Sequence, residues 1–421
     1  MRRRHSSGDK DFNPETLALG YGYDPFLSEG SLKPPVFLTS TFQFDSAEEG
    51  KRFFELAYGL REPADGEERG LIYSRLNNPN LQIFEERMAA WDGAEVGATF
   101  ASGMAAISTA MLGLLRPGDA VISTEPVYGG THYLFNRILP AYGMHVEWVP
   151  AGGDAAERMR RITDGGTGSR TRVLYMETPA NPSNVHTDIA AVSALGRELA
   201  AKHGAPVATV VDNTFLGPLF QRPIDQGANL VLYSATKFIG GHSDLIAGVV
   251  TGSRRLMARV LEMRTILGTS TTPFNGWLLL RSLETLSVRM RRQAKSARTL
   301  AALLAEHPRV KRIFYPGLLR PGDPQHDIWK RQCSGAGSLI SFEIDGGEKE
   351  AFAVLDRFEV IRLAVSLGGT ESLVEHPMSM THADVPRHEL EAQGVTEGLI
   401  RMSVGLEHLS DLERDLLHAL G

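Results

Sequence analysis

Short apolar segments alternate with helix-forming segments through the middle of the chain, between residues 77 and 285. Two of the apolar runs, TRVLYMET at 171–178 and VATVVDN at 207–213, have the length and composition of buried strands. Between them, residues 188–204 have the pattern of an amphipathic helix that ends on a glycine. Further strands are predicted at 120–124, 145–150, 230–235 and 247–252, and further helices at 81–93 and 102–115. This alternation predicts an α/β fold with a mostly parallel sheet covered by helices on both faces.

The two ends of the chain have a different character. Residues 1–76 are irregular and rich in glycine, proline and aromatic residues, with a polar insertion at 60–70. Such a segment cannot form a core alone, so we expect it to pack on something else, such as another subunit. Residues 286–421 are predicted to form a smaller α+β domain beside the large domain at 77–285. Its expected elements are helices at 288–307 and 409–420 and strands at 337–344 and 398–405.

Composition narrows the class of protein. A chain of 421 residues exceeds one ordinary core, and its net charge of −6 argues against a nucleic-acid partner, which would require a basic face. The single cysteine, Cys333, excludes an internal disulfide and fits a reducing cytoplasm. The basic start MRRRHSSGDKDF has no apolar run behind it, so we expect no signal peptide, and no apolar stretch has membrane-spanning length. We therefore expect a cytoplasmic protein with no membrane partner.

Polar residues follow three of the predicted strands at the point where each strand ends. Asp212 follows one apolar run, and Asn181 and Lys237 come just after two others. Because ligands of parallel sheets bind at the carboxyl ends of the strands, we expect these three side chains to converge on one edge. Each has an ordinary explanation when taken singly, since Lys237 could be a surface lysine and Asp212 could cap a turn.

The helix predicted at 102–115 begins with Ser102, Gly103 and Met104. Its free backbone N–H groups and its positive dipole end suit a phosphate, and the hydroxyls of Ser234 and Thr236 can add to that site. A phosphate site, a carboxylate for a ring nitrogen and an amine for an aldehyde together describe pyridoxal 5′-phosphate (PLP).

Several motifs carry a family resemblance. They are YSRLNNPN at 73–80, ASGMAAI at 101–107, EPVYGGT at 125–131, ETPANP at 177–182, VVDNTF, SATKFIGGHSD, AVSLGGTESLVEHPMSMTH and GLIRMSVGLE. In this order they resemble the γ-family of PLP enzymes of sulfur amino-acid metabolism, which includes methionine γ-lyase, cystathionine γ-lyase, cystathionine γ-synthase and the O-acylhomoserine sulfhydrylases. The resemblance implies the aspartate-aminotransferase-like fold (type I) and a homotetramer, a dimer of dimers with active sites shared between subunits.

The resemblance assigns the chemistry to three residues. Lys237 would bond to the cofactor aldehyde and, once displaced by the substrate, would move protons between the substrate carbons and the cofactor. Asp212 would pair with the pyridinium nitrogen and keep it protonated. Tyr128 would stack on the ring, and its hydroxyl is a candidate acid for the leaving group.

Further residues would hold the cofactor and the substrate. The phosphate contacts would come from Gly103, Met104, Ser234 and Thr236, and from Tyr73 and Arg75 of the neighbouring subunit. Asn181 would lie near the cofactor 3-oxygen. Arg401 would bind the substrate α-carboxylate as a bidentate fork, helped by Ser366.

Two positions give opposite indications about the reaction. Val365 stands where relatives that handle cystathionine often carry a glutamate, and its apolar side chain suits a short thioether or acyl tail. Gly130, by contrast, stands where methionine γ-lyases place a cysteine, and Arg264-Thr265 replaces their Lys-Asp pair. We expect both Val365 and Gly130 to border the substrate.

These features predict a PLP enzyme for γ-elimination or γ-replacement on a sulfur-containing or O-acylated homoserine-type amino acid. The first expectation is a methionine γ-lyase-like C–S lyase that gives 2-oxobutanoate, ammonia and a thiol. The alternatives are a γ-replacement enzyme (cystathionine γ-synthase or O-acylhomoserine sulfhydrylase) and a cystathionine γ-lyase. A non-catalytic PLP-binding regulatory protein is the alternative from another class, and turnover separates it from the enzymes. No metal is expected.

Overall fold

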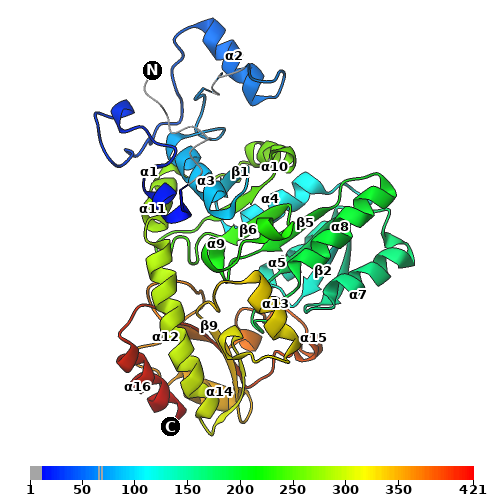
Figure 1. The fold of residues 1–421 in the computed structure, drawn as a ribbon, viewed down its shortest axis with the longest axis vertical. Helices are drawn as coiled ribbons and strands as arrows, with labels where there is room; N and C mark the ends of the chain where they lie inside the picture. Colours follow the sequence, from blue (N-terminus) through cyan, green and yellow to red (C-terminus); the bar gives the residue numbers. More distant parts are fainter. Residues whose placement is uncertain (1–11, 65–66, 68–69) are drawn as a thin grey trace.

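A computed structural model describes residues 12–64, 67 and 70–421 of the chain (Figure 1). A seven-stranded sheet has the order β1-β7-β6-β5-β4-β2-β3. Strands β6, β5, β4, β2 and β3 run parallel, whereas β7 is antiparallel to both of its neighbours. The strands are β1 (Val96–Phe100), β2 (Ala120–Glu125), β3 (His145–Pro150), β4 (Thr171–Glu177), β5 (Ala208–Asp212), β6 (Leu230–Ser234) and β7 (Gly248–Gly252). The predicted α/β class and mostly parallel sheet are confirmed.

Both faces of this sheet are buried under helices. Leu230 and Leu232 of β6 pack in a core cluster with residues of α4 (Gly103–Leu114) and α10 (Arg254–Leu267). The alternate residues Val231 and Tyr233 pack with α3 (Pro79–Asp92) and α11 (Pro273–Leu283) on the other face. Farther along that face, α7 (Ala155–Ile162) and α8 (Ile189–His203) cover β4 and β5. Because helices cover both faces, the central strands of this sheet have to be apolar on both sides.

The predicted helices of the large sheet are present with caps of the expected kinds. The Asn78 side chain caps α3 by accepting from the Asn80 N–H, and the helix ends at Gly93 in the left-handed conformation (φ 68°). The Asp188 side chain caps α8 in the same way, and Gly204 ends it. The strand β1 was not predicted. Its sequence VGATF contains Gly97, whose place a larger residue could not take, because a Cβ there would lie 2.5 Å from the Glu85 carbonyl oxygen.

The C-terminal part forms a second sheet of five strands in the order β10-β11-β12-β9-β8. The predicted strands correspond to β9 (Leu339–Ile344) and β12 (Leu399–Ser403), and the predicted helices to α12 (Leu286–Glu306) and α16 (Leu409–Leu420). The other strands, β8 (Val310–Phe314), β10 (Arg362–Leu363) and β11 (Leu373–Glu375), were not predicted. α12 and α16 pack against this sheet in a separate apolar cluster (Figure 1). The expected boundaries at residues 76/77 and 285/286 stay predictions.

The N-terminal segment is more regular than the sequence suggested. It contains α1 (Pro14–Gly20) and the eleven-residue helix α2 (Ala47–Ala57), which lies apart from both sheets in Figure 1. The expectation of an irregular segment is wrong for α2, because local capping specifies the helix. The Ser46 hydroxyl accepts from the Glu49 N–H, and the Glu49 carboxylate accepts from the Asp45 N–H. The basic start at residues 1–11 lies outside the described residues.

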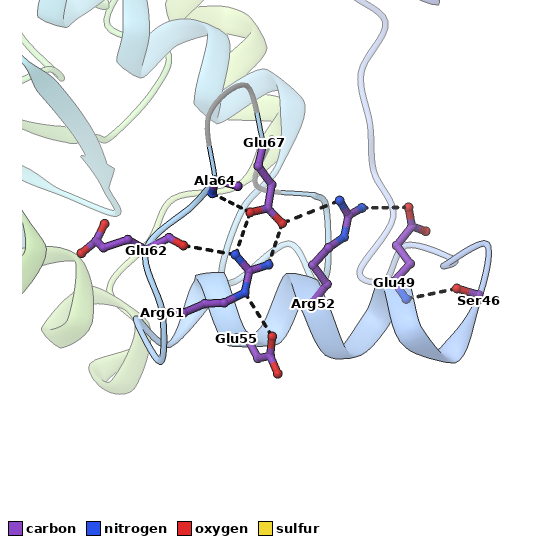
Figure 2. A network of polar contacts seen from close by, with 8 residues as sticks. All are labelled: Ser46, Glu49, Arg52, Glu55, Arg61, Glu62, Ala64 and Glu67. Carbon is purple, nitrogen blue, oxygen red and sulfur yellow. Dashed lines mark hydrogen bonds and ion pairs between the residues drawn. The ribbon is translucent and has the colours of Figure 1, made fainter.

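The polar insertion folds back on α2 through an ion-pair network (Figure 2). The Arg61 guanidinium donates to both carboxylate oxygens of Glu67 at 2.7 and 2.6 Å and to Glu55 at 3.2 Å. Glu67 also accepts from the Ala64 N–H at 2.8 Å and lies 3.7 Å from the Arg52 guanidinium. The hydrogen bond from Arg61 lowers the pKa of Glu67 to about 2. Residues 65–66 and 68–69 of the insertion lie outside the described part.

None of the helices in the described part of the chain has the length and apolarity that a membrane crossing requires.

Candidate active site

The carboxyl ends of the parallel strands lie side by side, as predicted. Glu177 ends β4 and Asp212 ends β5, and the two are paired across the strands in the register of the sheet. Ser234 ends the next strand, β6. Asn181 and Lys237 follow β4 and β6 by a few residues, so the side chains expected at one edge arise from neighbouring strands.

The Lys237 side chain is mostly buried and points to the C-terminal part of the chain. Its Nζ donates to the Ser366 hydroxyl at 2.9 Å. Burial and, to a lesser extent, the nearby positive charge of Arg401 lower the pKa of Lys237 to about 8, although the negative charge of Glu375 acts in the opposite direction. Ser366 adopts φ 128°, a conformation that side-chain-bearing residues rarely take. The amine therefore releases its proton more readily than an exposed lysine does.

Arg401 on β12 is the centre of a buried group of polar side chains. Its Nη1 donates to the Asn181 Oδ1 at 2.9 Å, and its Nη2 donates to the Ser366 carbonyl at 3.2 Å. Nη2 also forms an ion pair with the Glu375 Oε1 at 2.7 Å, and both side chains are almost fully buried. Four residues singled out in the sequence, Lys237, Ser366, Arg401 and Asn181, are thus joined by consecutive hydrogen bonds.

Sequence reasoning missed Glu375. It lies on β11 directly opposite Arg401 on the adjacent antiparallel strand β12. A buried arginine requires a nearby negative charge, because an unpaired charge in the interior is costly. The motif AVSLGGTESLVEHPMSMTH contains two glutamates, Glu371 and Glu375, and only the strand pairing shows which of them faces Arg401.

Asp212 is fixed by Thr214. Its Oδ1 accepts from the Thr214 N–H at 3.0 Å and from the Thr214 hydroxyl at 2.6 Å. Burial raises the pKa of Asp212, and the hydrogen bonds from Thr214 oppose that shift. The Thr214 hydroxyl also accepts from the Ser234 N–H at 2.9 Å. Both bonds from Thr214 use one oxygen, so they leave the other oxygen, Oδ2, to a different donor.

The start of α4 lies against Ser234. The Ser102 side chain caps the helix by accepting from the Ala105 N–H. A Cβ on Gly103 would lie 2.9 Å from the Ser234 Cβ, so only glycine lets the helix start approach this closely. Thr236 was expected to turn its hydroxyl to the same site. In the structure that hydroxyl donates to the Ala247 carbonyl and accepts from the Ala247 N–H, which ties the loop to the residue before β7, and its contact with the phosphate stays a prediction.

Tyr128 begins the short helix α5 (Gly129–Tyr133), and its side chain is partly exposed. Its backbone N–H donates to the Glu177 Oε2 at 2.8 Å. A Cβ on Gly130 would lie 2.7 Å from the Tyr128 ring and 2.9 Å from the Met104 sulfur. The structure therefore places Tyr128, Gly130 and Met104 together.

Tyr73 and Arg75 lie in a different place. The Arg75 Nη1 donates to the Thr265 carbonyl at 2.6 Å, in the last turn of α10, and the guanidinium lies 6.0 Å from the Tyr73 ring. Arg75 and Thr265 line a cavity of about 610 Å³ between α2, α3 and α10. The residues that line it include neither Lys237 nor Arg401. Within one described chain, Tyr73 and Arg75 are thus separate from the buried group around Arg401.

Arg264 and Val365 occupy contrasting environments. Arg264 is buried and forms an ion pair with Glu85 at 2.6 Å, which fastens α10 to α3. Val365 is 57% exposed, next to Ser366.

The sequence matches a family model over almost its whole length. The model is described as "Cys/Met metabolism PLP-dependent enzyme", and it matches residues 15–421.

The chain belongs to this family of PLP-dependent enzymes.

Relatives within the family cover almost all of the chain. An L-methionine gamma-lyase from Pseudomonas deceptionensis is 40% identical over 413 residues, 98% of each chain. A cystathionine beta-lyase from Coxiella burnetii is 36% identical over 418 residues, 99% of this chain and 100% of its own. The crystal structure of a cystathionine gamma synthase from Xanthomonas oryzae pv. oryzae in complex with cystathionine has a TM-score of 0.85 and 35% identity, and the match covers 97% of this chain and 98% of that one.

The residues present fit the cofactor that the family uses. PLP requires an amine for its aldehyde, an acceptor for its ring nitrogen and donors for its phosphate. Lys237 supplies a buried amine with a lowered pKa, and Asp212 supplies a buried carboxylate. The start of α4 supplies N–H groups beside Ser234. Among the described residues, no group of three or more His, Cys, Asp or Glu side chains is arranged to hold a metal ion.

Proposed function

We propose that this enzyme is a C–S lyase of the methionine γ-lyase type, which converts methionine and water to 2-oxobutanoate, ammonia and methanethiol. The observation that carries the proposal is the partly buried hydrogen-bonded series from Lys237 through Ser366 and Arg401 to Asn181. It joins a proton-transferring amine to a guanidinium suited to an amino-acid carboxylate. The 40% identity to an L-methionine gamma-lyase supports the choice of reaction.

The roles of the residues follow from their surroundings. PLP, when bound, withdraws electrons from the substrate so that protons can leave its α- and β-carbons. Asp212, through its carboxylate, would keep the cofactor ring nitrogen protonated. Lys237 would accept and return the protons, and a pKa of about 8 suits that task near neutral pH. Gly103, Met104, Ser234 and Thr236 would hold the phosphate near the start of α4.

Substrate binding and release of the thiol fall to other groups. Arg401 would bind the α-carboxylate through its planar donors. Tyr128, whose side chain is partly exposed and whose backbone is held by Glu177, would give its hydroxyl proton to the departing sulfur. Val365 would face the far end of the substrate, where an apolar side chain suits a methylthio group better than a charged one.

A γ-replacement reaction is the second candidate. The structural similarity to a cystathionine gamma synthase, with a TM-score of 0.85, favours it. Replacement and elimination diverge after the γ-substituent has left, since replacement needs a second substrate with a thiol. Both would use the same Lys237, Tyr128 and Arg401.

We further propose that the active enzyme is a cytoplasmic homotetramer, a dimer of dimers, in which Tyr73 and Arg75 reach the phosphate of the neighbouring subunit. Their separation from Lys237 within one chain supports this arrangement. The same segment also carries several large apolar side chains that are exposed in the single chain and that a neighbouring subunit would cover. They are Phe26, Leu27, Leu32, Leu38, Tyr58 and Leu60.

A substrate panel tests the reaction. Purified enzyme with PLP is given methionine, cystathionine or O-acetylhomoserine, each with and without an added thiol, and 2-oxobutanoate, pyruvate and thioether are measured. We expect 2-oxobutanoate from methionine without a thiol. Thioether formation from O-acetylhomoserine, with no 2-oxobutanoate from methionine, would establish the replacement enzyme instead. Pyruvate from cystathionine would indicate β-elimination.

A further inference from the structure

Glu177 has no role in the proposed chemistry, yet its carboxylate joins two loops of the site. The residue ends β4 and is only 4% exposed. Its Oε2 accepts from the Tyr128 N–H at 2.8 Å, and its Oε1 accepts from the Asn181 N–H at 3.1 Å. Tyr128 belongs to the loop after β2, and Asn181 to the loop after β4. One side chain thus fixes the backbone of both loops.

Each of these loops carries one half of the proposed reaction. Tyr128 would protonate the leaving sulfur. Asn181 accepts from the Arg401 guanidinium at 2.9 Å, and Arg401 would bind the substrate carboxylate. A displacement of either backbone by a few tenths of an ångström would therefore move a group that contacts the cofactor or substrate.

The carboxylate of Glu177 also lies close to other charges. Its neighbour across the strands is Asp212, and burial together with that like charge raises the pKa of Glu177 well above its usual range. The two backbone N–H donors and the Arg401 guanidinium act in the opposite direction. Both oxygens of Glu177 accept from these backbone N–H groups, whereas a glutamine would turn its own N–H toward one of them.

We propose that Glu177 is a positioning residue, which holds Tyr128 and Asn181 in register so that leaving-group protonation and carboxylate binding occur in one geometry. This inference rests on the proposed function for the roles of Tyr128 and Arg401. The opposing view is that Glu177 merely satisfies two buried N–H groups. In that case, replacing Glu177 would lower the stability of the protein without a specific effect on leaving-group protonation or on carboxylate binding.

The test compares Glu177→Gln with Glu125→Gln in the PLP-loaded enzyme. Glu125 ends the adjacent strand β2 and is a half-buried carboxylate whose hydrogen bond comes from Gln393, outside the site. For Glu177→Gln we expect kcat/KM to fall about ten- to a hundredfold, the cost of leaving one buried N–H group without an acceptor, with kcat lowered and KM raised. The absorbance band of the lysine-bound cofactor should persist, because Lys237 is unchanged. Glu125→Gln should stay within about twofold of wild type.

A double-mutant cycle with Tyr128→Phe separates positioning from stability. If Glu177 acts through Tyr128, Glu177→Gln should lower kcat much less in the Tyr128→Phe background than in wild type. If the two substitutions acted independently, their separate effects on kcat would multiply in the double variant to within about twofold. That result, or wild-type kinetics for Glu177→Gln, would overturn the proposal. If Glu177→Gln does not fold, Glu177→Asp replaces it in the test. This variant keeps a carboxyl group but moves its oxygens back by the length of one methylene, and we expect the same dependence of kcat on the Tyr128→Phe background. Absence of PLP binding or turnover in the wild type would instead refute the proposed function.

Discussion

Breaking the ion pair between Arg401 and Glu375 should lower the stability of the folded protein by a measurable amount. Both side chains are almost fully buried, 3% and 1% exposed, and the Nη2–Oε1 distance is 2.7 Å. Glu375→Gln preserves the shape of the side chain and removes its charge, so the guanidinium stays buried with its hydrogen bonds to Asn181 and Ser366 but loses its paired carboxylate. Breaking a buried pair in this way typically costs about 3–5 kcal/mol.

That cost converts into a shift in melting temperature. A chain of 421 residues has an unfolding entropy of about 0.9 kcal/mol per kelvin near 60 °C, so the expected fall in Tm is about 3–6 °C. The assay is a thermal melt of the PLP-loaded protein at one protein concentration, because cofactor and subunit binding also shift Tm. Glu198→Gln is the matched control. Glu198 accepts two hydrogen bonds from Arg160 at 2.5 and 2.8 Å, but on the surface, and we expect little change there.

The same substitution has a second, independent effect on Lys237. The negative charge of Glu375 raises the pKa of Lys237, which burial has lowered to about 8. Without that charge the pKa falls further, so the rise of kcat with pH that follows loss of the Lys237 proton should move to lower pH. An unchanged Tm together with an unchanged pH profile would refute the reasoning, since it would mean that Glu375 does not face Arg401 and Lys237.

Three further substitutions test the assignment of the site. Lys237→Ala should abolish the absorbance band of the lysine-bound cofactor and essentially all turnover; near-wild-type turnover with added PLP would disprove its role. Val365→Glu should shift the ratio of kcat/KM values toward cystathionine and away from methionine, because it strands a charge beside a thioether, and an unchanged ratio would mean that Val365 does not face the substrate. Arg75→Ala should weaken PLP retention about tenfold or more. Mixing Arg75→Ala with Lys237→Ala subunits should restore activity if Arg75 acts on the neighbouring subunit, and confirmed exchange without recovery would assign it to its own.

Local pattern was sufficient for the parts of the fold in which one residue type dominates a short stretch. The strand β5 is a continuous apolar run, and α8 combines an Asp188 cap, an apolar stripe and Gly204 at its end. Such signals need no knowledge of neighbours. The strand β1 fails this criterion, because Gly97 and Ala98 have low strand propensity, and Gly97 is needed for the close approach of α3.

The candidate site likewise has parts that the sequence predicts and parts that it does not. The positions of Asp212, Asn181 and Lys237 could be predicted because each lies at the end of a strand of one sheet or a few residues after it. The contacts of Arg401 could not, since its partners Asn181 and Glu375 come from different sheets and only the folded chain brings them together. Tertiary contacts also decide which way a side chain turns: the Thr236 hydroxyl bonds to both backbone groups of Ala247, a contact that the local pattern does not indicate.

Ser366 shows a compromise between folding and chemistry. Its φ of 128° is a conformation that glycine adopts freely and that costs any other residue about 1–3 kcal/mol. Glycine, however, has no hydroxyl to accept a hydrogen bond from Lys237, and that hydroxyl lies 2.9 Å from the amine. The chain thus keeps a less stable residue at the one position where its carbonyl engages Arg401 and its side chain engages Lys237. Selection for stability alone would replace this serine, so its persistence in a stabilised variant would be a sign that activity had been selected as well.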